Sequence, residues 1–408
     1  MEKEDGIHGM LPCGQMPLHV QKFRAVYERK PNAPIYHTEG WYYCLDAWRE
    51  QGLPKNLEPG TDEWNEFFHF DPEAKHIIRG LGWVQAEYHP QFEENVIEVR
   101  NDGTELIQDF AGRKVLMFKG RRSGFMPEYV DHPVKDRQSW EELIQWRLDF
   151  NNQDRQADLA KAVQEMIAKA KRGYFMQQRA IGAYMYLRSL IGPEGLLYMF
   201  YDDPDLIHAC LQKWFDLSDA VIAETQKHVS LDEIFFGEDI CYKSGPLISP
   251  AMIEEFLMPH YSKLVKNARR RQIDQQRPLH IQIDTDGQCM PVIPLYKKYL
   301  EMDVMSPFEA ASGCDVLQIG RDYPNLIMIH GIDKRILAKS KEAIDTELER
   351  IIPPLKKRGG YIPACDHGVP EEVSLENYLH YPEKNGRTGW ISDSSGKPRE
   401  KTWKIKSI

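Results

Sequence analysis

The sequence predicts an α/β protein whose main domain is a single (β/α)8 barrel of the TIM type, with an N-terminal helical extension and a small β-rich excursion. The chain has 408 residues, which suits one large barrel with additions. Short apolar runs alternate with helical stretches in its second half, as in a parallel sheet with crossover helices. Five of these runs end in ionisable residues. The length favours a closed barrel over an open sheet, although periodicity alone does not separate the two.

The second half of the chain supplies the regular pattern. The five runs expected to be strands are LDEIFF (231–236), LHIQI (279–283), DVMSP (303–307), NLIMIHG (325–331) and GYIPA (360–364). Helices are expected over 249–271, over 289–301, near 312–323 and, as one or two pieces, over 333–358. The first of these has Pro250 in its first turn, where proline is favoured.

The first half is less regular. A short helical piece is expected at Tyr42–Glu50, and residues 92–118 alternate around an Asn-Asp-Gly turn, as in a hairpin. From 136 to 172 the pattern is helical, with Asp136 as an N-cap. We therefore expect an N-terminal extension over 1–80, a barrel over 81–385 and a C-terminal tail over 386–408.

Composition limits the function classes. Lys plus Arg number 52 and Asp plus Glu 62, so the formal charge is −10, which argues against general nucleic-acid binding but leaves room for a basic pocket. Seven cysteines form no CxxC pair, which indicates a reducing compartment with buried thiols. MEKEDGIHGML has no apolar core of a secretory signal, and no run of eighteen apolar residues occurs. We expect a cytoplasmic protein that does not enter a membrane.

Ionisable residues follow each of the five expected strands. In a (β/α)8 barrel the C-terminal ends of the strands carry the active site, so several of these side chains are predicted to share one site. We expect at least three of the six carboxylates and imidazoles in this set to face one cavity. They are Glu238, Asp239, Asp284, Asp286, Glu309 and His367.

Each acidic pair also has a structural interpretation. Glu238 and Asp239 are candidates for a metal site or for general acid–base catalysis, but equally for helix caps or ion pairs. Asp284 and Asp286 are candidates for the same chemistry, but also for shaping a turn. Lys243 is a candidate for binding an anionic group, or a solvated surface lysine.

Two further residues have alternatives of the same kind. His280 lies in phase with Gln282 and Asp284 on one strand face, so it is either a metal ligand or a hydrogen-bonded core residue. Cys365 precedes Asp366 and His367 at a strand end. It is either a site residue or a small buried apolar one.

Several segments carry a resemblance that spans nearly the whole chain. They are GWYYCLDAWREQGLP (40–54), MPEYVDHPVKDRQSWEEL (126–143), LRSLIGPEGLLYMFYDDPDLI (187–207), GEDICYKSGPLISPAMIEEFLMPHY (237–261), DTDGQCMPVIPLY (284–296), SPFEAASGCDVLQI (306–319), HGIDKRILA (330–338) and GGYIPACDHGVPEEVSLENYLHY (359–381). The chain resembles the uroporphyrinogen decarboxylase superfamily, and within it the corrinoid-linked methyltransferase branch. The resemblance implies a (β/α)8 barrel with an N-terminal helical extension.

The resemblance leaves two reactions in competition. Uroporphyrinogen decarboxylases need no cofactor and carry an arginine-bearing motif, P-x-W-x-M-R-Q-A-G-R, that grips propionates. The corresponding stretch here is APIYHTEGWYYCLDAWR (33–49), which retains only Arg49, in a different register. The departure argues against decarboxylation of uroporphyrinogen, which we keep as the alternative function, together with that of another polycarboxylate.

The methyltransferase relatives imply zinc. Their site resembles His-x-Cys at the end of one strand with a second Cys at the end of the last strand. Alignment on Gly287 places Asp284 and Asp286 at the first two positions, whereas alignment on the histidine places His280 and Gln282 there. Cys365 matches the final cysteine in both cases. The metal candidates are thus Asp284, Cys365 and His280, with Asp286 or His367 completing an oxygen-rich or mixed set.

The resulting hypothesis is a methyltransferase that moves a methyl group between a small methylated compound or acceptor and a corrinoid. No corrinoid-binding motif is visible, so the corrinoid would be carried by a partner protein; a homodimer is also considered. The candidate catalytic residues are Glu238, Asp239, Asp286 and His367, and the candidate substrate-binding residues are Lys243, Glu309, His330 and Asp366. A non-catalytic ligand-binding barrel is the third hypothesis.

Overall fold

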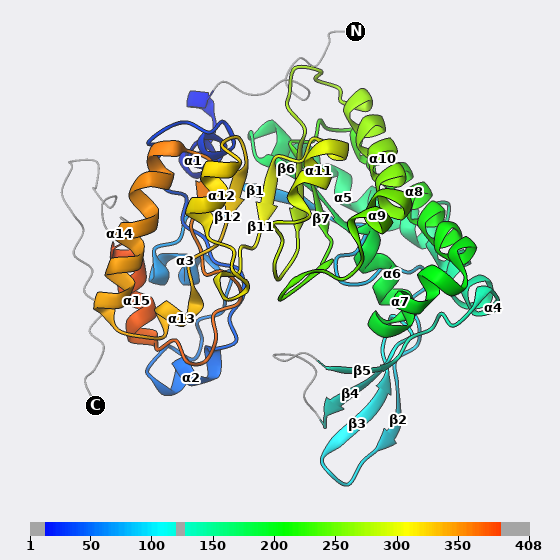
Figure 1. Ribbon diagram of the computed structural model, residues 1–408. Coiled ribbons are helices and arrows are strands. Elements are labelled where there is room, and N and C mark those ends of the chain that lie inside the picture. Colours follow the sequence, from blue (N-terminus) through cyan, green and yellow to red (C-terminus); the bar gives the residue numbers. More distant parts are fainter. Residues whose placement is uncertain (1–12, 120–126, 385–408) are drawn as a thin grey trace. The chain divides into compact units, whose positions relative to one another are not determined.

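A computed structural model describes residues 13–119 and 127–384. The chain divides into two compact units, which are treated separately below (Figure 1). Unit 1 comprises Met1–Val20 and Lys75–Ser306, and unit 2 comprises Gln21–Ala74 and Pro307–Ile408. The expected extension over 1–80 is divided between the units, and the expected tail over 386–408 lies outside the described residues. The boundaries drawn from the sequence stay predictions.

Five parallel strands form the sheet of unit 1. Their order follows the chain: β1 (Lys75–Ile78), β6 (Phe175–Ile181), β7 (Glu233–Gly237), β10 (His280–Asp284) and β11 (Val304–Ser306). Each adjacent pair is parallel. The register of β7 and β10 runs from Glu233 opposite His280 to Gly237 opposite Asp284. Residues that end neighbouring strands therefore lie side by side.

The two faces of this sheet differ in what covers them. Phe236 packs against the rings of Trp214 and Tyr261, with ring centres 6.2 and 5.0 Å apart, so it faces the helices. Because side chains alternate along a strand, Phe235 points to the opposite face. The residues in register with Phe235, namely Arg179 and Gln282, share that inner face.

Helices cover the outer face of the sheet in unit 1. Their bounds are α4 (Arg137–Ser139), followed by π-helical Trp140–Ile144 and 3-10 Gln145–Leu148, α5 (Gln153–Lys171), α6 (Ala183–Ile191), α7 (Pro193–Asp202), α8 (Pro204–Gln226), α9 (Pro250–Met252), π-helical Ile253–Leu257, α10 (Met258–Arg271) and α11 (Ile293–Leu300). The expected N-cap Asp136 is confirmed, because its side chain and that of Ser139 form a capping box. Ser249 caps α9, which begins at Pro250.

Two small antiparallel sheets complete unit 1. The β-rich excursion is confirmed as β2 (Asn95–Val99), β3 (Thr104–Gln108), β4 (Lys114–Phe118) and β5 (Glu128–Asp131), which extend away from the helices of the unit (Figure 1). A short hairpin, β8 (Cys241–Tyr242) with β9 (Gly245–Pro246), follows β7. The hairpin places Lys243 in its turn.

Unit 2 contains one parallel strand pair and the N- and C-terminal helices. Strand β12 (Ile327–Ile329) pairs with β13 (Tyr361–Ile362). The helices are α2 (Leu45–Glu50), α3 (Asp62–Phe68), α12 (Val316–Asp322), α13 (Lys334–Leu337), α14 (Lys341–Arg358) and α15 (Leu375–Lys384), with a 3-10 turn at Ala310–Ser312. Helix α1 (Leu18–Tyr27) begins in unit 1, which also holds a 3-10 turn at Cys13–Gln15, and continues into unit 2. Trp48, Phe68 and Tyr378 pack ring against ring in its core.

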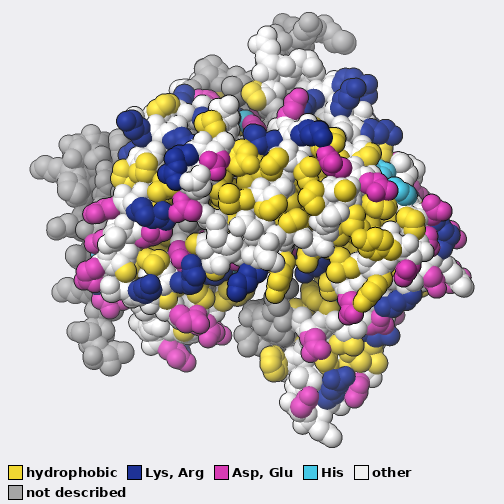
Figure 2. Space-filling model, in the orientation of Figure 1, with side chains coloured by type: hydrophobic (Ala, Val, Ile, Leu, Met, Phe, Trp, Pro, Cys, Tyr) yellow, Lys and Arg dark blue, Asp and Glu magenta, His cyan; other side chains and the backbone are white. Residues whose placement is uncertain are grey.

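The α/β barrel-type fold class is confirmed, since the expected strands are present as β7, β10, β11, β12 and β13, in parallel pairings. The sequence pattern missed β1 and β6, whose residues do not form apolar runs. Among the described residues, no helix is long and apolar enough to cross a membrane. On the face shown in Figure 2, Lys and Arg side chains are interspersed with Asp and Glu side chains, in agreement with the nearly balanced charge.

Candidate functional site

The loops that follow β7 and β10 are hydrogen-bonded to each other. The backbone N–H groups of Glu238 and Asp239 donate to the carbonyl oxygen of Asp284, at 2.8 and 3.3 Å. The hydroxyl of Thr285 accepts from the next two N–H groups of the first loop, both at 3.1 Å. Four of the acidic residues singled out from the sequence, including Asp286, therefore lie on two adjoining loops at the C-terminal ends of the strands.

Glu238 is fully buried, and its carboxyl group points into the protein. It accepts hydrogen bonds from the hydroxyls of Tyr261 and, at 2.8 Å, Tyr296. Burial raises the pKa of Glu238 to about 7, although these hydrogen bonds oppose the shift. A Cβ atom on Gly182 would lie 1.7 Å from this carboxyl oxygen. Its hydrogen bonds and its lack of exposed surface give Glu238 a structural role, and its catalytic role stays a prediction.

Asp239 anchors the same loop from outside. Its carboxylate forms an ion pair with Arg188 of α6, and about a third of each side chain is exposed. Its φ angle of 42° lies in the left-handed region, which aspartate tolerates better than most residues. The structure thus shows the ion pair that was one interpretation of Asp239, and the acid–base role stays a prediction.

Asp284 and Asp286 present half-buried carboxylates at the end of β10. Ser306, at the end of β11, donates its hydroxyl proton to Asp284, and the amide of Gln282 donates to that hydroxyl at 2.7 Å. Gly287 has a φ of 76°, and a Cβ there would lie 2.6 Å from the carbonyl oxygen of Tyr242. The turn-shaping interpretation therefore belongs to Gly287, and the two aspartates remain candidates for chemistry.

His280 lies at the opposite end of β10 from Asp284. Its Nδ1 atom is 2.7 Å from the carboxylate of Asp303, and only 13% of its side chain is exposed. Burial alone would lower the pKa of His280, but the hydrogen bond and charge of Asp303 raise it. Four residues of extended strand separate it from Asp284 by roughly 13 Å. Its contact with Asp303 agrees with the interpretation of His280 as a hydrogen-bonded core residue, and its role as a metal ligand stays a prediction.

Lys243 is exposed in the turn between β8 and β9. Within the described part of the chain, its ammonium group forms no ion pair with the loops that follow β7 and β10. The solvated-surface interpretation is the one that this geometry favours over substrate binding.

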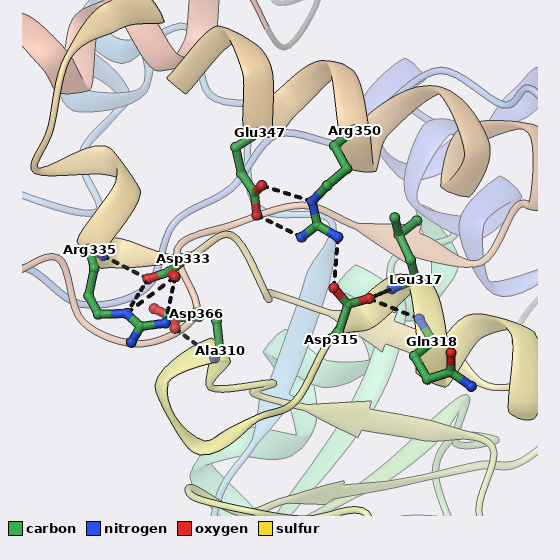
Figure 3. A network of polar contacts seen from close by, with 9 residues as sticks. All are labelled: Ala310, Asp315, Leu317, Gln318, Asp333, Arg335, Glu347, Arg350 and Asp366. Atoms are coloured by element: carbon green, nitrogen blue, oxygen red, sulfur yellow. Dashed lines mark hydrogen bonds and ion pairs between the residues drawn. The ribbon is translucent and has the colours of Figure 1, made fainter. Parts of the chain in front are cut away.

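In unit 2, Asp366 is a buried connector. Its carboxylate accepts hydrogen bonds from the backbone N–H groups of Ala310 at 3.0 Å and Lys334 at 3.1 Å; the first is drawn in Figure 3. Burial raises the pKa of Asp366 to about 6, against the lowering effect of Lys334. Glu309 forms an ion pair with Lys334 at 3.1 Å. Asp366 has no exposed surface and joins these loops, and its role in substrate binding stays a prediction.

Cys365 lies in the core of unit 2. Its side chain has no exposed surface, and its backbone N–H donates to the carboxylate of Glu39 at 3.0 Å. Burial and the charges of Glu39 and Asp366 raise the pKa of the thiol well above its usual value. A neutral buried thiol fits the core interpretation of Cys365.

The two histidines at the strand ends of unit 2 belong to an aromatic cluster. The ring centre of His367 is 5.6 Å from that of Trp41 and 6.3 Å from that of Tyr43, with which it is stacked. His330 meets Trp41 edge-on at 6.2 Å and has a φ of 77°. His367 and His330 thus both contact Trp41, and their roles in a shared site stay predictions.

Comparison with known proteins assigns the chain to a family. Residues 122–383, more than half of the chain, match the family Uroporphyrinogen decarboxylase (URO-D). The chain belongs to the uroporphyrinogen decarboxylase family. No curated protein sequence matches it.

Solved structures agree with the family fold. A methyltransferase from Methanosarcina mazei is similar with a TM-score of 0.53 and 12% identity, over 90% of this chain and 98% of that one. Xylanase B from Clostridium stercorarium F9 reaches a TM-score of only 0.29 at 12% identity, over 54% and 72% of the two chains. The first likeness supports the fold of this family member, and the second is too weak to add to it.

The zinc inferred from the family resemblance stays a prediction, since its candidates Asp284 and Cys365 belong to different units. Among the described residues, no group of three or more His, Cys, Asp or Glu side chains could hold a metal ion. His280 pairs with Asp303 at the wrong end of its strand, and the Cys365 thiol is buried in the core. Because structural and catalytic zinc needs at least three such ligands, no catalytic step is assigned to zinc here.

One polar residue of this family member was missed by the sequence patterns. Arg179 lies in β6, whose sequence FMQQRAI is otherwise buried, and its guanidinium is 4.8 Å from the ring centre of Trp83 and 5.3 Å from that of Phe235. It lines a cavity of about 680 Å³ in unit 1. The sequence feature that could have indicated Arg179 is a charged residue inside a segment, FMQQRAI, in which polar and apolar residues do not alternate regularly. None of the six acids and imidazoles expected to share a cavity lines this one, and that expectation stays a prediction.

Proposed function

We propose that this chain is a methyltransferase of the uroporphyrinogen decarboxylase family. It would transfer a methyl group between the heteroatom of a small methylated compound, or an acceptor, and a corrinoid carried by a partner protein. The observation that carries the proposal is the fold likeness to the Methanosarcina methyltransferase, which extends over nearly the full length of both chains. Corrinoid transfer and the identity of the substrate belong to the proposal alone.

The acid chemistry of the reaction fits the end of β10. When a methyl group leaves an oxygen, nitrogen or sulfur atom, that atom gains an electron pair and must take up a proton, which a positioned carboxyl group can supply. Asp284 and Asp286 are half-buried there, and Ser306 and Gln282 fix the position of Asp284 through hydrogen bonds. We assign Asp284 the role of proton donor to the leaving atom, and Asp286 a supporting role at the same strand end.

The ion pair that Arg49 forms argues against decarboxylation of uroporphyrinogen. Arg49 is the one arginine near the position of the family motif, and its guanidinium forms an ion pair with Glu58 at 2.8 Å. A guanidinium that is already paired with a carboxylate of the protein binds the propionates of a substrate less well. We therefore expect no conversion of uroporphyrinogen at the turnover usual for enzymes.

The test uses the purified full-length chain with free cobalamin in place of the partner protein. Reduced cobalamin is incubated with a panel of methylated alcohols, amines, thiols and ethers, and methylation is followed by the change in its absorbance. The expected result is methylation with at least one donor, and its loss in Asp284→Asn. Zinc content is measured on the same preparation.

Two outcomes would overturn the proposal. Formation of coproporphyrinogen from uroporphyrinogen at ordinary turnover would favour the decarboxylase. Absence of both reactions, when a known corrinoid methyltransferase is active in the same assay, would favour the non-catalytic barrel.

A further inference from the structure

The inner face of the unit 1 sheet carries a cation as well as carboxylates. Arg179 is in register with Phe235 and Gln282, two residues before the level at which Asp284 ends its strand. All of these residues point away from the helices. Placing a guanidinium inside a buried strand costs free energy through desolvation, so such an arginine is expected where it binds a charged group.

The rings beside Arg179 determine where it can bind. Trp83 and Phe235 lie within about 5 Å of the guanidinium carbon, at the ring-centre distances given above. Contact with aromatic rings uses the flat faces of a guanidinium and leaves its N–H groups, which lie in the plane, directed outward. Two N–H groups on one edge match the two oxygens of a carboxylate.

The cavity beside Arg179 supplies the rest of a binding site. Its volume of about 680 Å³ lies within the range of small-molecule sites. Trp83, Tyr88 and Phe110 contribute aromatic surface to its lining, and Val84, Ala86 and Pro90 contribute aliphatic surface. Walls of this kind suit a flat apolar body attached to the charged group.

Acidic residues at the same cavity limit the charge of the ligand. Glu87, Asp154 and Asp158 also line it. Glu87 lies 3.5 Å from His89, and Asp158 forms an exposed ion pair with Lys161, so these two carboxylates have partners of their own. A ligand with several negative charges would be repelled by them, whereas a ligand with a single carboxylate can bind at Arg179 alone.

We propose that Arg179, Trp83 and Phe235 form a binding site for a small monocarboxylate with a planar apolar body. The site deepens the proposed function and rests on it in one respect, namely that this ligand is the methylated substrate. Two strand spacings across the sheet and two residues along it separate the Arg179 level from Asp284 by roughly 12 Å. A ligand of about that length, with its carboxylate on Arg179, brings its far end to the proposed proton donor.

Trp83 is held in place by the end of the neighbouring strand. A Cβ atom on Gly237 would lie 2.4 Å from the indole of Trp83, so the ring approaches the backbone closely there. This close approach explains why glycine ends β7.

The test is direct binding and needs no corrinoid, so it can fail or succeed independently of methyl transfer. Benzoate is titrated into the full-length protein by calorimetry, with benzamide as an uncharged probe of the same shape and citrate as a polyanion. We expect benzoate to bind, and benzamide and citrate to bind at least tenfold more weakly. Arg179→Gln should weaken benzoate binding at least tenfold, and Arg179→Lys should weaken it less.

A matched control is available in the same unit. Arg172 also lies over an aromatic ring, 5.2 Å from the centre of Tyr174, but is exposed and outside the cavity, so Arg172→Gln should leave benzoate affinity unchanged. Trp83→Leu, a change in a loop, tests the site without altering the strand. Lack of benzoate binding by the wild-type protein, equal affinities for benzoate and benzamide, or full affinity in folded Arg179→Gln would each overturn the proposal.

Discussion

The two ends of strand β10 carry polar residues on the same face but use them differently. At the N-terminal end, His280 pairs with Asp303, and on the neighbouring strands Gln177 donates to Glu233 at 2.5 Å. Gln177 and Glu233 are buried, and His280 and Asp303 are largely so. At the C-terminal end, Asp284 is half-buried and accepts a hydrogen bond from the hydroxyl of Ser306.

The difference shows that a polar residue on an inward strand face has one of two roles. A buried pair costs desolvation on both sides and is stable only when each partner is retained, so it belongs to the architecture. A carboxylate with part of its surface exposed keeps the capacity to exchange a proton with a ligand. The predictions below separate these roles at the two ends of the sheet, beginning with the largest effect.

The C-terminal end should depend most on the close packing beneath its loops. Gly182→Ala places a Cβ atom 1.7 Å from a carboxyl oxygen of Glu238 and 2.8 Å from the carbonyl oxygen of Gly237. Relieving both clashes requires backbone movement, so we expect a loss of unfolding free energy of more than about 3 kcal/mol in chemical denaturation. Gly195→Ala in α7 is the control. Its Cβ has ordinary contacts, and a gain of about 0.5–1 kcal/mol is expected. A folded Gly182→Ala protein of normal stability would contradict the packing.

Asp284→Asn tests the functional end. The amide keeps the volume and can still bond to Ser306, but it cannot give up a proton. We expect methyl transfer to fall about 100-fold or more, with the melting temperature nearly unchanged. Turnover and thermal unfolding measured on one preparation decide the matter. A protein that loses stability and keeps its turnover would move Asp284 into the same class as His280.

Much of the fold could be predicted because the second half of the chain has a clear period. The strands ending at Gly237 and Asp284 were expected within a residue or two, because apolar runs of that length bounded by helices have few other interpretations. Strand β6 was missed, since Gln177, Gln178 and Arg179 interrupt its apolar pattern. Gln177 and Arg179 face the inside of the sheet, whereas Gln178 faces the helices, where the hydroxyl of Thr225 in α8 donates to its amide oxygen. Because polar residues lie on both faces of β6, its sequence shows neither an apolar run nor an alternation of polarity.

The candidate site was predicted only in part. Position along the chain correctly placed Glu238, Asp239, Asp284 and Asp286 on adjoining loops. It could not show that the Glu238 carboxyl turns inward between two tyrosines, since the relevant residues lie 23 and 58 positions away. The alternation along β10 correctly placed His280 on the same face as Asp284. It could not show that the two residues lie at opposite ends of the strand, because an alternation of two residues does not tell how far along the strand a residue lies from the site.

His280→Gln tests the structural end. We expect a loss of unfolding free energy of about 2 kcal/mol at pH 6, because the charged hydrogen bond to Asp303 is lost. The pKa of His280 is raised on folding, so its contribution is complete below the unfolded pKa near 6.5 and disappears as the pH rises through the folded pKa. The difference between variant and wild type should therefore shrink toward pH 9, with turnover per folded molecule unchanged. His228→Gln, at a more exposed histidine, should change stability by less than about 0.5 kcal/mol.

The smallest effect is expected at Lys243, which the sequence marked as a binding residue for an anionic group. Its ammonium is exposed in a hairpin turn, whereas Arg179 is held between two rings on the inner face of the sheet. An exposed lysine is hydrated and mobile, so its attraction to a carboxylate is weak and screened by salt. Lys243→Ala should therefore change unfolding free energy by less than about 0.5 kcal/mol. It should also leave the benzoate affinity within twofold of wild type at 0.15 M salt, in the titration that separates Arg179→Gln from its control. A tenfold loss of benzoate affinity in Lys243→Ala would mean that the hairpin closes over the ligand. Lys243 would then be the cation that recognises the carboxylate, as the sequence indicated.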